Sequence, residues 1–145
     1  MNKGQSLFEV VVALAISALI IIALVSLVSN SIRNANFSKN KTLAGVYVQE
    51  ATEWLRGQRD NDIDTFSTNV LTSQWCLQDL SWGIPGSCED DATIAGTPFI
   101  REVNFTITSV SGKTMIETNI VVSWTDSQGL HNVSSTTNFS DWRQR

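Results

Sequence analysis

The chain has 145 residues, a formal net charge of −4 and no stretch rich in lysine or arginine. A chain of this length is expected to form one small folded unit, and its acidic balance argues against electrostatic binding to nucleic acid. One histidine, His131, and two cysteines are too few for a dedicated metal cluster.

The chain begins with a long apolar stretch. No residue between Glu9 and Arg33 carries a formal charge, a run of 23 residues. As a helix rising ~1.5 Å per residue, this run would be about 34 Å long, enough to cross a hydrocarbon core ~30 Å thick. It is longer than the apolar part of a secretory signal peptide, and it starts with an acid. We therefore expect a membrane-spanning helix over residues 5–30.

Glu9 is the residue that a plain membrane anchor does not explain. An unpaired carboxylate within lipid costs on the order of 2 to 3 kcal/mol or more, so we expect a partner for it. Arg33, Lys39 and Lys41 follow the run and only Lys3 precedes it, which by charge alone favours a cytoplasmic body. The cysteine pair and the strands rich in serine and threonine favour an extracytoplasmic body instead.

Residues 3–9, KGQSLFE, and the apolar run after them resemble the processing and assembly segment of type IV pilins and type II secretion pseudopilins. The resemblance extends over roughly residues 3–60, and it includes minor pilins of the V or I type. It implies cleavage by a prepilin peptidase between Gly4 and Gln5, methylation of the Gln5 amine and an assembly role for Glu9. The partners that it implies are homologous pilin subunits, a membrane assembly platform and, before assembly, the lipid bilayer.

Two features depart from the pattern of that family. The first mature residue would be Gln5, where most members have Phe or Met, so cyclisation to pyroglutamate is an alternative to methylation. A cyclised end would lack the amine that is expected to pair with Glu9 of a neighbouring subunit. In addition, no proline precedes Pro85, which predicts a straight N-terminal helix.

Residues 31–59 keep a helical rhythm while they become more polar. Apolar side chains recur at spacings of three and four residues and form one stripe: Leu43, Ala44, Tyr47, Val48, Ala51, Trp54 and Leu55. Such a stripe is typical of a helix that packs on a sheet, and we expect its two aromatic side chains in the core. The pattern predicts one helix from about Ser6 to Gln58, with Gly57 as an end signal.

Residues 60–98 are predicted to be irregular. They contain both cysteines, Cys76 and Cys88, which would close a loop worth about 3 kcal/mol of chain entropy in an oxidising compartment. We expect a disulfide between them. The alternatives are two free buried thiols or half of an intermolecular metal site.

Few residues could bind a metal or carry out catalysis. Asp60, Asp62 and Asp64 have the alternating spacing of a calcium loop, but the glycine and the glutamate of such a loop are missing. A solvated acidic turn is the favoured interpretation, and residues 89–91 are a second acidic candidate. His131 lies in a predicted strand, and no motif places a base beside a nucleophile. No catalytic residue, metal or other cofactor is therefore predicted, and the chain is not expected to be an enzyme.

From Phe99 onward the period of the apolar residues changes to two, which predicts antiparallel strands over residues 99–145. Short turn-like connections at Ser111-Gly112 and at residues 126–129 favour a meander. The stripe on the preceding helix can cover the apolar face of this sheet. We therefore predict an α+β fold, with a long helix on a small antiparallel sheet. The tail at residues 141–145 is interpreted as frayed or as a contact to a neighbouring subunit.

Three functions fit these observations. The first is a structural subunit of a type IV pilus-like filament, made as a membrane prepilin with residues 1–4 as its leader. The second is a minor or initiating pseudopilin of a secretion or DNA-uptake system. The third belongs to another class, a single-span anchored binding or sensor protein. The first two place the chain in the inner membrane with an extracytoplasmic C-terminal domain, and then in an extracellular or periplasmic filament.

Overall fold

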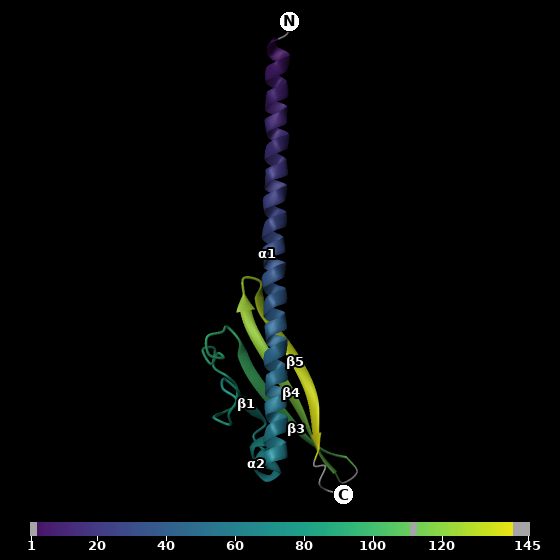
Figure 1. The fold of residues 1–145 in the computed structure, drawn as a ribbon, viewed down its shortest axis with the longest axis vertical. Helices are drawn as coiled ribbons and strands as arrows, with labels where there is room; N and C mark the ends of the chain where they lie inside the picture. The colour runs from purple at the N-terminus through teal and green to yellow at the C-terminus, as the bar shows by residue number, and fades with distance from the viewer. Residues whose placement is uncertain (1–2, 111–112, 141–145) are drawn as a thin grey trace. The chain divides into compact units, whose positions relative to one another are not determined.

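A computed structural model of the chain describes residues 3–110 and 113–140. Within them the fold is α+β, as the sequence predicts, with a long N-terminal helix and a small antiparallel sheet (Figure 1). The elements are α1 (Lys3–Asn61), α2 (Ile63–Val70), β1 (Gln74–Cys76), β2 (Ile84–Pro85), β3 (Ile100–Val110), β4 (Lys113–Asp126) and β5 (Gly129–Ser140). The chain divides into two compact units, residues 1–40 and residues 41–145.

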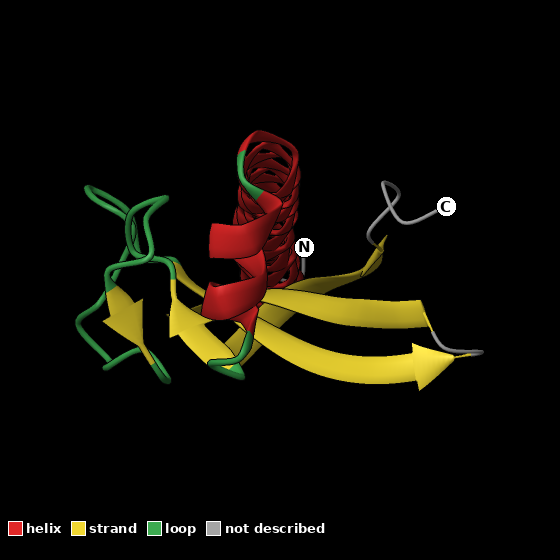
Figure 2. Ribbon diagram, turned by 90° about the horizontal axis from the view of Figure 1, so that it is seen from below, coloured by secondary structure: helices red, strands yellow, loops and turns green. Residues whose placement is uncertain are grey.

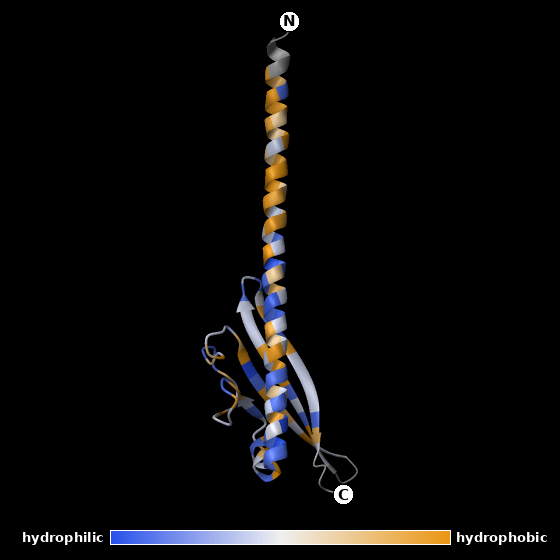
Figure 3. Ribbon diagram, in the orientation of Figure 1, coloured by the Kyte–Doolittle hydropathy of each residue, from blue (hydrophilic) through white to orange (hydrophobic). Residues whose placement is uncertain are grey.

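The first unit contains the N-terminal part of α1. Its large apolar side chains are exposed, and Figure 3 shows the ribbon of this part of the helix mostly in the orange of hydrophobic residues. The hydroxyl of Ser17 donates to the carbonyl of Ala13, and the hydroxyl of Ser26 donates to that of Ile22. Both polar groups are thus satisfied within the helix itself. By its length and composition, this segment could span a membrane.

The second unit is built on a five-stranded sheet with the order β2-β1-β3-β4-β5, in which all neighbouring strands are antiparallel. The strands β3, β4 and β5 form the predicted meander. Residues 41–61 of α1 and the short helix α2 lie on one face of this sheet (Figure 2). The apolar stripe of α1 is the part that faces it, since Ala44, Ala51 and Leu55 are completely buried.

An aromatic cluster occupies the core between the helices and the sheet. Phe66 of α2 is 1% exposed and contacts the rings of Trp82, Phe105 and Phe139. Edge-to-face pairs of this kind add about 0.5 to 1.5 kcal/mol beyond the area that they bury. The two aromatic residues of the α1 stripe also pack in the second unit. Tyr47 contacts Phe99, and Trp54 contacts Trp82.

The helix α1 continues past the end signal that the sequence suggests at Gly57. Glycine there costs about 1 kcal/mol relative to alanine, but tertiary contacts outweigh this cost. Trp82 packs on Trp54 and donates from Nε1 to Oε1 of Gln58 at 3.2 Å, which holds the last turns of the helix. The helix therefore ends at Asn61 rather than near residue 58.

Residues 60–98 contain more regular structure than predicted. Asp62 caps α2, and its Oδ1 accepts from the backbone N–H groups of Asp64 and Thr65. The strands β1 and β2 extend the sheet beyond the predicted meander, with β1 paired to β3. These strands have three and two residues, too few for an alternating pattern to be recognised. The predicted turn at residues 111–112 and the tail at residues 141–145 lie outside the described residues.

Candidate functional site

Glu9 is exposed on α1 near the start of the apolar segment. It shares one side of the helix with Val12, Ala13 and Ile16, because residues three, four and seven apart lie on the same face. The hydroxyls of Ser17 and Ser26 are bonded within the helix, whereas Glu9 presents a charged carboxylate on the same exposed, largely apolar segment.

The other two residues of the predicted processing site are Gly4 and Gln5. Their backbone belongs to the first turns of α1, so the predicted leader boundary falls within helical structure. Their side chains, together with residues 1–2, lie outside the described part of the chain. The structure therefore places the Glu9 carboxylate but not the groups around the Gln5 amine.

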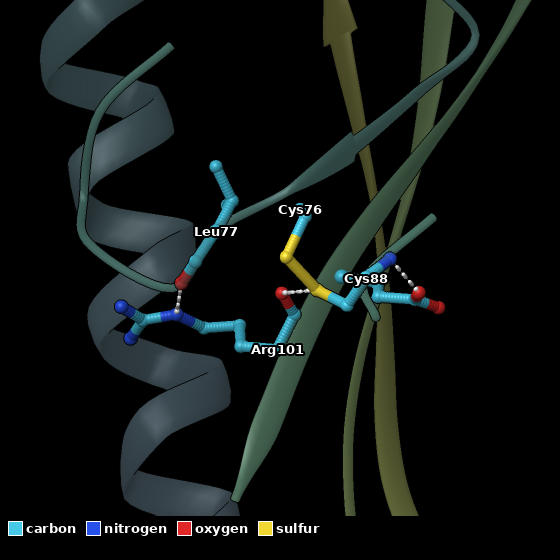
Figure 4. The surroundings of a disulfide bond; sticks show 5 residues. Cys76, Leu77, Cys88 and Arg101 are labelled. Carbon is cyan, nitrogen blue, oxygen red and sulfur yellow. Dashed lines mark hydrogen bonds between the residues drawn. A yellow bond between two sulfur atoms is a disulfide. The ribbon is translucent and has the colours of Figure 1, made fainter. Parts of the chain in front are cut away.

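The expected disulfide between Cys76 and Cys88 is present (Figure 4). Cys76 lies in β1 and is 1% exposed. The backbone N–H of Cys88 donates to Oε1 of Glu102 in β3 at 2.7 Å. The Cys88 sulfur also lies 3.4 Å from the carbonyl oxygen of Arg101, a contact without a hydrogen bond because a disulfide sulfur carries no proton. The loop between the cysteines is thus tied to β3.

Arg101 is an important residue that the sequence did not reveal. It lies in β3 with only 2% of its surface exposed, and its Nε donates to the Leu77 carbonyl at 3.0 Å. Its Nη1 donates to Oε2 of Glu50 at 2.8 Å, and Figure 4 shows the guanidinium between β3 and α1. In return, the Leu77 N–H donates to the Arg101 carbonyl. The side chain therefore joins the helix, the sheet and the start of the disulfide loop.

Strand periodicity did contain a signal for Arg101. It has the same parity as Phe99, Val103 and Phe105, all of which face the core. An arginine at such a position requires acceptors, because a buried charge without them is very costly. The identity of its partner could not be inferred, because Glu50 lies outside the apolar stripe of α1.

The acidic residues that were considered for calcium have local structural roles. Asp62 caps α2, as described above, and Asp60 pairs with Arg59 at 2.7 Å. The backbone carbonyls of Glu89 and Asp91 accept hydrogen bonds within a turn. In the described residues with their side chains, no three His, Cys, Asp or Glu residues are grouped so that they could hold a metal ion.

His131 belongs to the hairpin between β4 and β5. Its Nε2 lies 2.9 Å from Oδ1 of Asp126, and its ring packs on that of Trp124. The same carboxylate oxygen accepts from the backbone N–H of Gln128 at 2.7 Å. These contacts fasten the turn, and Gly129 supplies the positive φ of 117° that the turn requires.

The contacts of Asp126 in this hairpin predict how the stability of the fold depends on pH. The hydrogen bond from the Gln128 backbone N–H, with a further contribution from His131, lowers the pKa of Asp126 below its ordinary 3.8. A carboxylate with a lowered pKa stabilises the fold above its ordinary pKa, and this contribution is lost as the pH falls through the lower folded value. Thermal unfolding between about pH 5 and pH 2 is expected to show a smaller acid-induced loss in Asp126→Asn than in the wild type. Identical pH dependence in the two proteins would contradict this role.

A scan against protein-family models, a search of curated proteins and a search of solved structures each return no match to this chain. The functional inference therefore depends on the residues and contacts described above. Of these, Glu9 and the exposed apolar surface of α1 point outward, whereas Arg101, the disulfide and the hairpin act within the second unit.

Proposed function

We propose that the chain is a structural subunit of a type IV pilus-like filament, made as a membrane prepilin and cleaved after Gly4. The observation that carries the proposal is the single carboxylate of Glu9 at the head of a run of 23 uncharged residues in α1. A helix that served only as an anchor would gain nothing from this acid, since burying it in lipid is unfavourable. A helix that must pack beside copies of itself does gain from it.

The pairing proposed for Glu9 follows from elementary electrostatics. Cleavage after Gly4 creates a new amine on Gln5, and a neighbouring subunit can place this cation against the Glu9 carboxylate. Within an apolar bundle such a pair is strongly favoured over two separate buried charges. Because the amine and the carboxylate lie at different heights on the helix, the pair also selects one axial stagger between neighbours.

The rest of the chain suits the same role. The exposed apolar surface of α1 can face lipid before assembly and other helices afterwards. The disulfide agrees with a second unit that folds in an oxidising, extracytoplasmic compartment. The proposed location is thus a single-pass inner membrane protein before assembly and an extracellular or periplasmic filament afterwards. A prepilin peptidase and a membrane assembly platform are the proposed partners.

A minor or initiating subunit of a secretion or DNA-uptake system is the second candidate. The absence of proline before Pro85 favours it, because many major pilins carry a kinking proline in the apolar segment. Counting the copies of this subunit in purified filaments distinguishes the two, since an initiating subunit occurs rarely and near one end.

Replacing Glu9 tests the proposal directly. Glu9→Ala is expected to leave membrane insertion intact and to reduce incorporation into filaments at least about tenfold, the effect of losing roughly 1.4 kcal/mol of pairing. Ser17→Ala is the matched control, because the Ser17 hydroxyl is satisfied within the helix. Incorporation is measured by immunoblotting sheared filaments against the membrane fraction. Wild-type incorporation of Glu9→Ala would refute the proposed role of Glu9.

Mass analysis of the N-terminus in the same material checks the processing step. The proposal requires a cut after Gly4, and the mass of the mature chain distinguishes a methylated Gln5 from a cyclised one. A chain that keeps Met1, or one that is cut elsewhere, would contradict the proposal and favour an anchored binding or sensor protein.

A further inference from the structure

The two edges of the sheet differ in how well they are protected. The edge strand β2 has two residues, and one of them is Pro85, which has no N–H to offer. The other edge strand, β5, has 12 residues, and among the described residues 3–110 and 113–140 it pairs with β4 alone. Its sequence contains no Asp, Glu, Lys, Arg or Pro, the residues with which proteins usually block pairing at an edge. The β5 edge, drawn in yellow in Figure 1, is thus open to another strand.

A groove of about 520 Å³ runs between this strand and α1. Gly45, Val48 and Thr52 of α1 form one side, and Val133, Ser135 and Thr137 of β5 form the other. The side chains of β4 that face the helix are buried, but those three residues of β5 are only half-buried. A Cβ atom added at Gly45 would meet no atom within 4 Å. The groove therefore has room for side chains from outside.

The charges around the groove restrict what can fill it. Glu53 and Arg56 are charged side chains in its lining, and they pair with each other at 2.6 Å. The strand β5 has no formal charge. An incoming charged side chain would find the charges of this lining already paired with each other, whereas an uncharged segment needs no counter-charge.

We propose that the β5 edge and its groove bind an extended, uncharged segment of another protein by strand addition. The backbone of the segment would hydrogen-bond to β5 as a sixth strand, and alternate side chains would enter the groove beside Gly45 and Val48. Backbone pairing supplies affinity, and uncharged side chains suit a lining in which the charges of Glu53 and Arg56 already pair with each other.

Two observations argue against a second copy of this chain as the occupant. Pro85 blocks the β2 edge of the second copy, so that edge cannot pair with β5 of the first copy and continue its sheet. Pairing of β5 with β5 in antiparallel fashion would turn residues 41–61 of the two α1 helices in opposite directions, because this part of α1 lies along one face of the sheet (Figure 2). Subunits that share one membrane or filament need parallel helices. This requirement for parallel helices rests on the proposed function.

The test uses the full chain in detergent micelles and a random dodecapeptide library displayed on phage, depleted beforehand on empty micelles. Enriched peptides are then synthesised for affinity measurement. We expect uncharged sequences that bind Gly45→Trp at least tenfold more weakly than the wild type. Gly57→Trp is the matched control on the same helix, since a side chain at Gly57 also meets no atom within 4 Å and lies outside the groove.

A second pair of variants separates strand addition from other modes of binding. Ser135→Lys places a charge in the groove, whereas Thr136→Lys places it on the opposite, exposed face of β5. We expect loss of peptide binding only in Ser135→Lys, and bound peptide should slow hydrogen exchange of the β5 amides specifically.

Three outcomes would overturn this inference. The first is the absence of enriched peptides, and the second is equal peptide binding by Gly45→Trp and the wild type. The third is self-association that Gly45→Trp abolishes, because a second copy would then be the occupant. None of them affects the test of Glu9. Filament incorporation that depends on Glu9, without peptide binding, would therefore reject only the strand-addition site.

Discussion

Arg101→Ala is expected to lower the free energy of unfolding by about 3 to 5 kcal/mol. The substitution empties a site in which the side chain is 2% exposed, and it removes the donor to the carbonyl of Leu77, itself completely buried. A cavity and an unsatisfied carbonyl each destabilise a fold, and here both arise from one change. Urea unfolding of the full chain in micelles, followed by tryptophan fluorescence, measures the effect.

Two matched variants separate the causes. Arg101→Met keeps most of the volume and loses the hydrogen bonds, so a loss of about 1 to 3 kcal/mol is expected. Glu50→Gln keeps an oxygen acceptor for the guanidinium, and the Glu50 side chain is 49% exposed. The free energy of unfolding is therefore expected to fall by about 1 kcal/mol or less. A urea midpoint of Arg101→Ala equal to that of the wild type would show that the Arg101 side chain does not hold the helix, sheet and loop together.

The contrast between Arg101 and its neighbours shows what the sequence could predict. Residues 31–59 repeat the spacing of a helix many times, and the segments after Phe99 repeat a spacing of two. The helix stripe and the β3–β5 meander were therefore recognisable. Arg101 is a single exception within such a pattern. Its role depends on Glu50, which is 51 residues away in the sequence, and no local pattern links the two.

The elements that were missed are short or are set by tertiary contacts. The helix α2 has eight residues, and its start at Asp62 was interpreted as part of an acidic turn. That aspartate is a good helix cap, with an apolar side chain at Phe66 that anchors the first turn in the core. The strands β1 and β2 exist because β3 and the disulfide hold them. The groove beside β5 could not be predicted from the sequence either, because it depends on how far α1 covers the sheet.

The prediction of the disulfide, which is present, and the prediction of a role for Glu9, which stays a prediction, both came from features that need no tertiary information. A charge within an apolar run is visible in any listing of residues, and two cysteines allow one intramolecular pairing. How the loop between those cysteines is fastened could not be inferred, because it depends on Glu102 and on the backbone of Arg101.

Removal of the disulfide is the second change for which a large loss of stability is expected. The bond closes a loop with a sequence separation of 12, and the chain-entropy model assigns about 3 kcal/mol to a loop of this size. The double variant Cys76→Ala, Cys88→Ser should therefore unfold at a clearly lower urea concentration than the oxidised wild type. Alanine suits position 76 because that side chain is 1% exposed.

Treatment of the wild type with dithiothreitol gives an independent measurement of the same bond. It should shift the urea midpoint of the wild type toward that of the double variant and leave the double variant unchanged. The loss should also be local, because β3, β4 and β5 pair over long registers whereas β2 pairs with β1 through two residues. Hydrogen exchange should therefore accelerate first in residues 77–88, which include β2. A wild-type midpoint that dithiothreitol does not move, with reduction verified by thiol titration, would show that the contacts of Arg101 and Glu102 hold the loop without the disulfide.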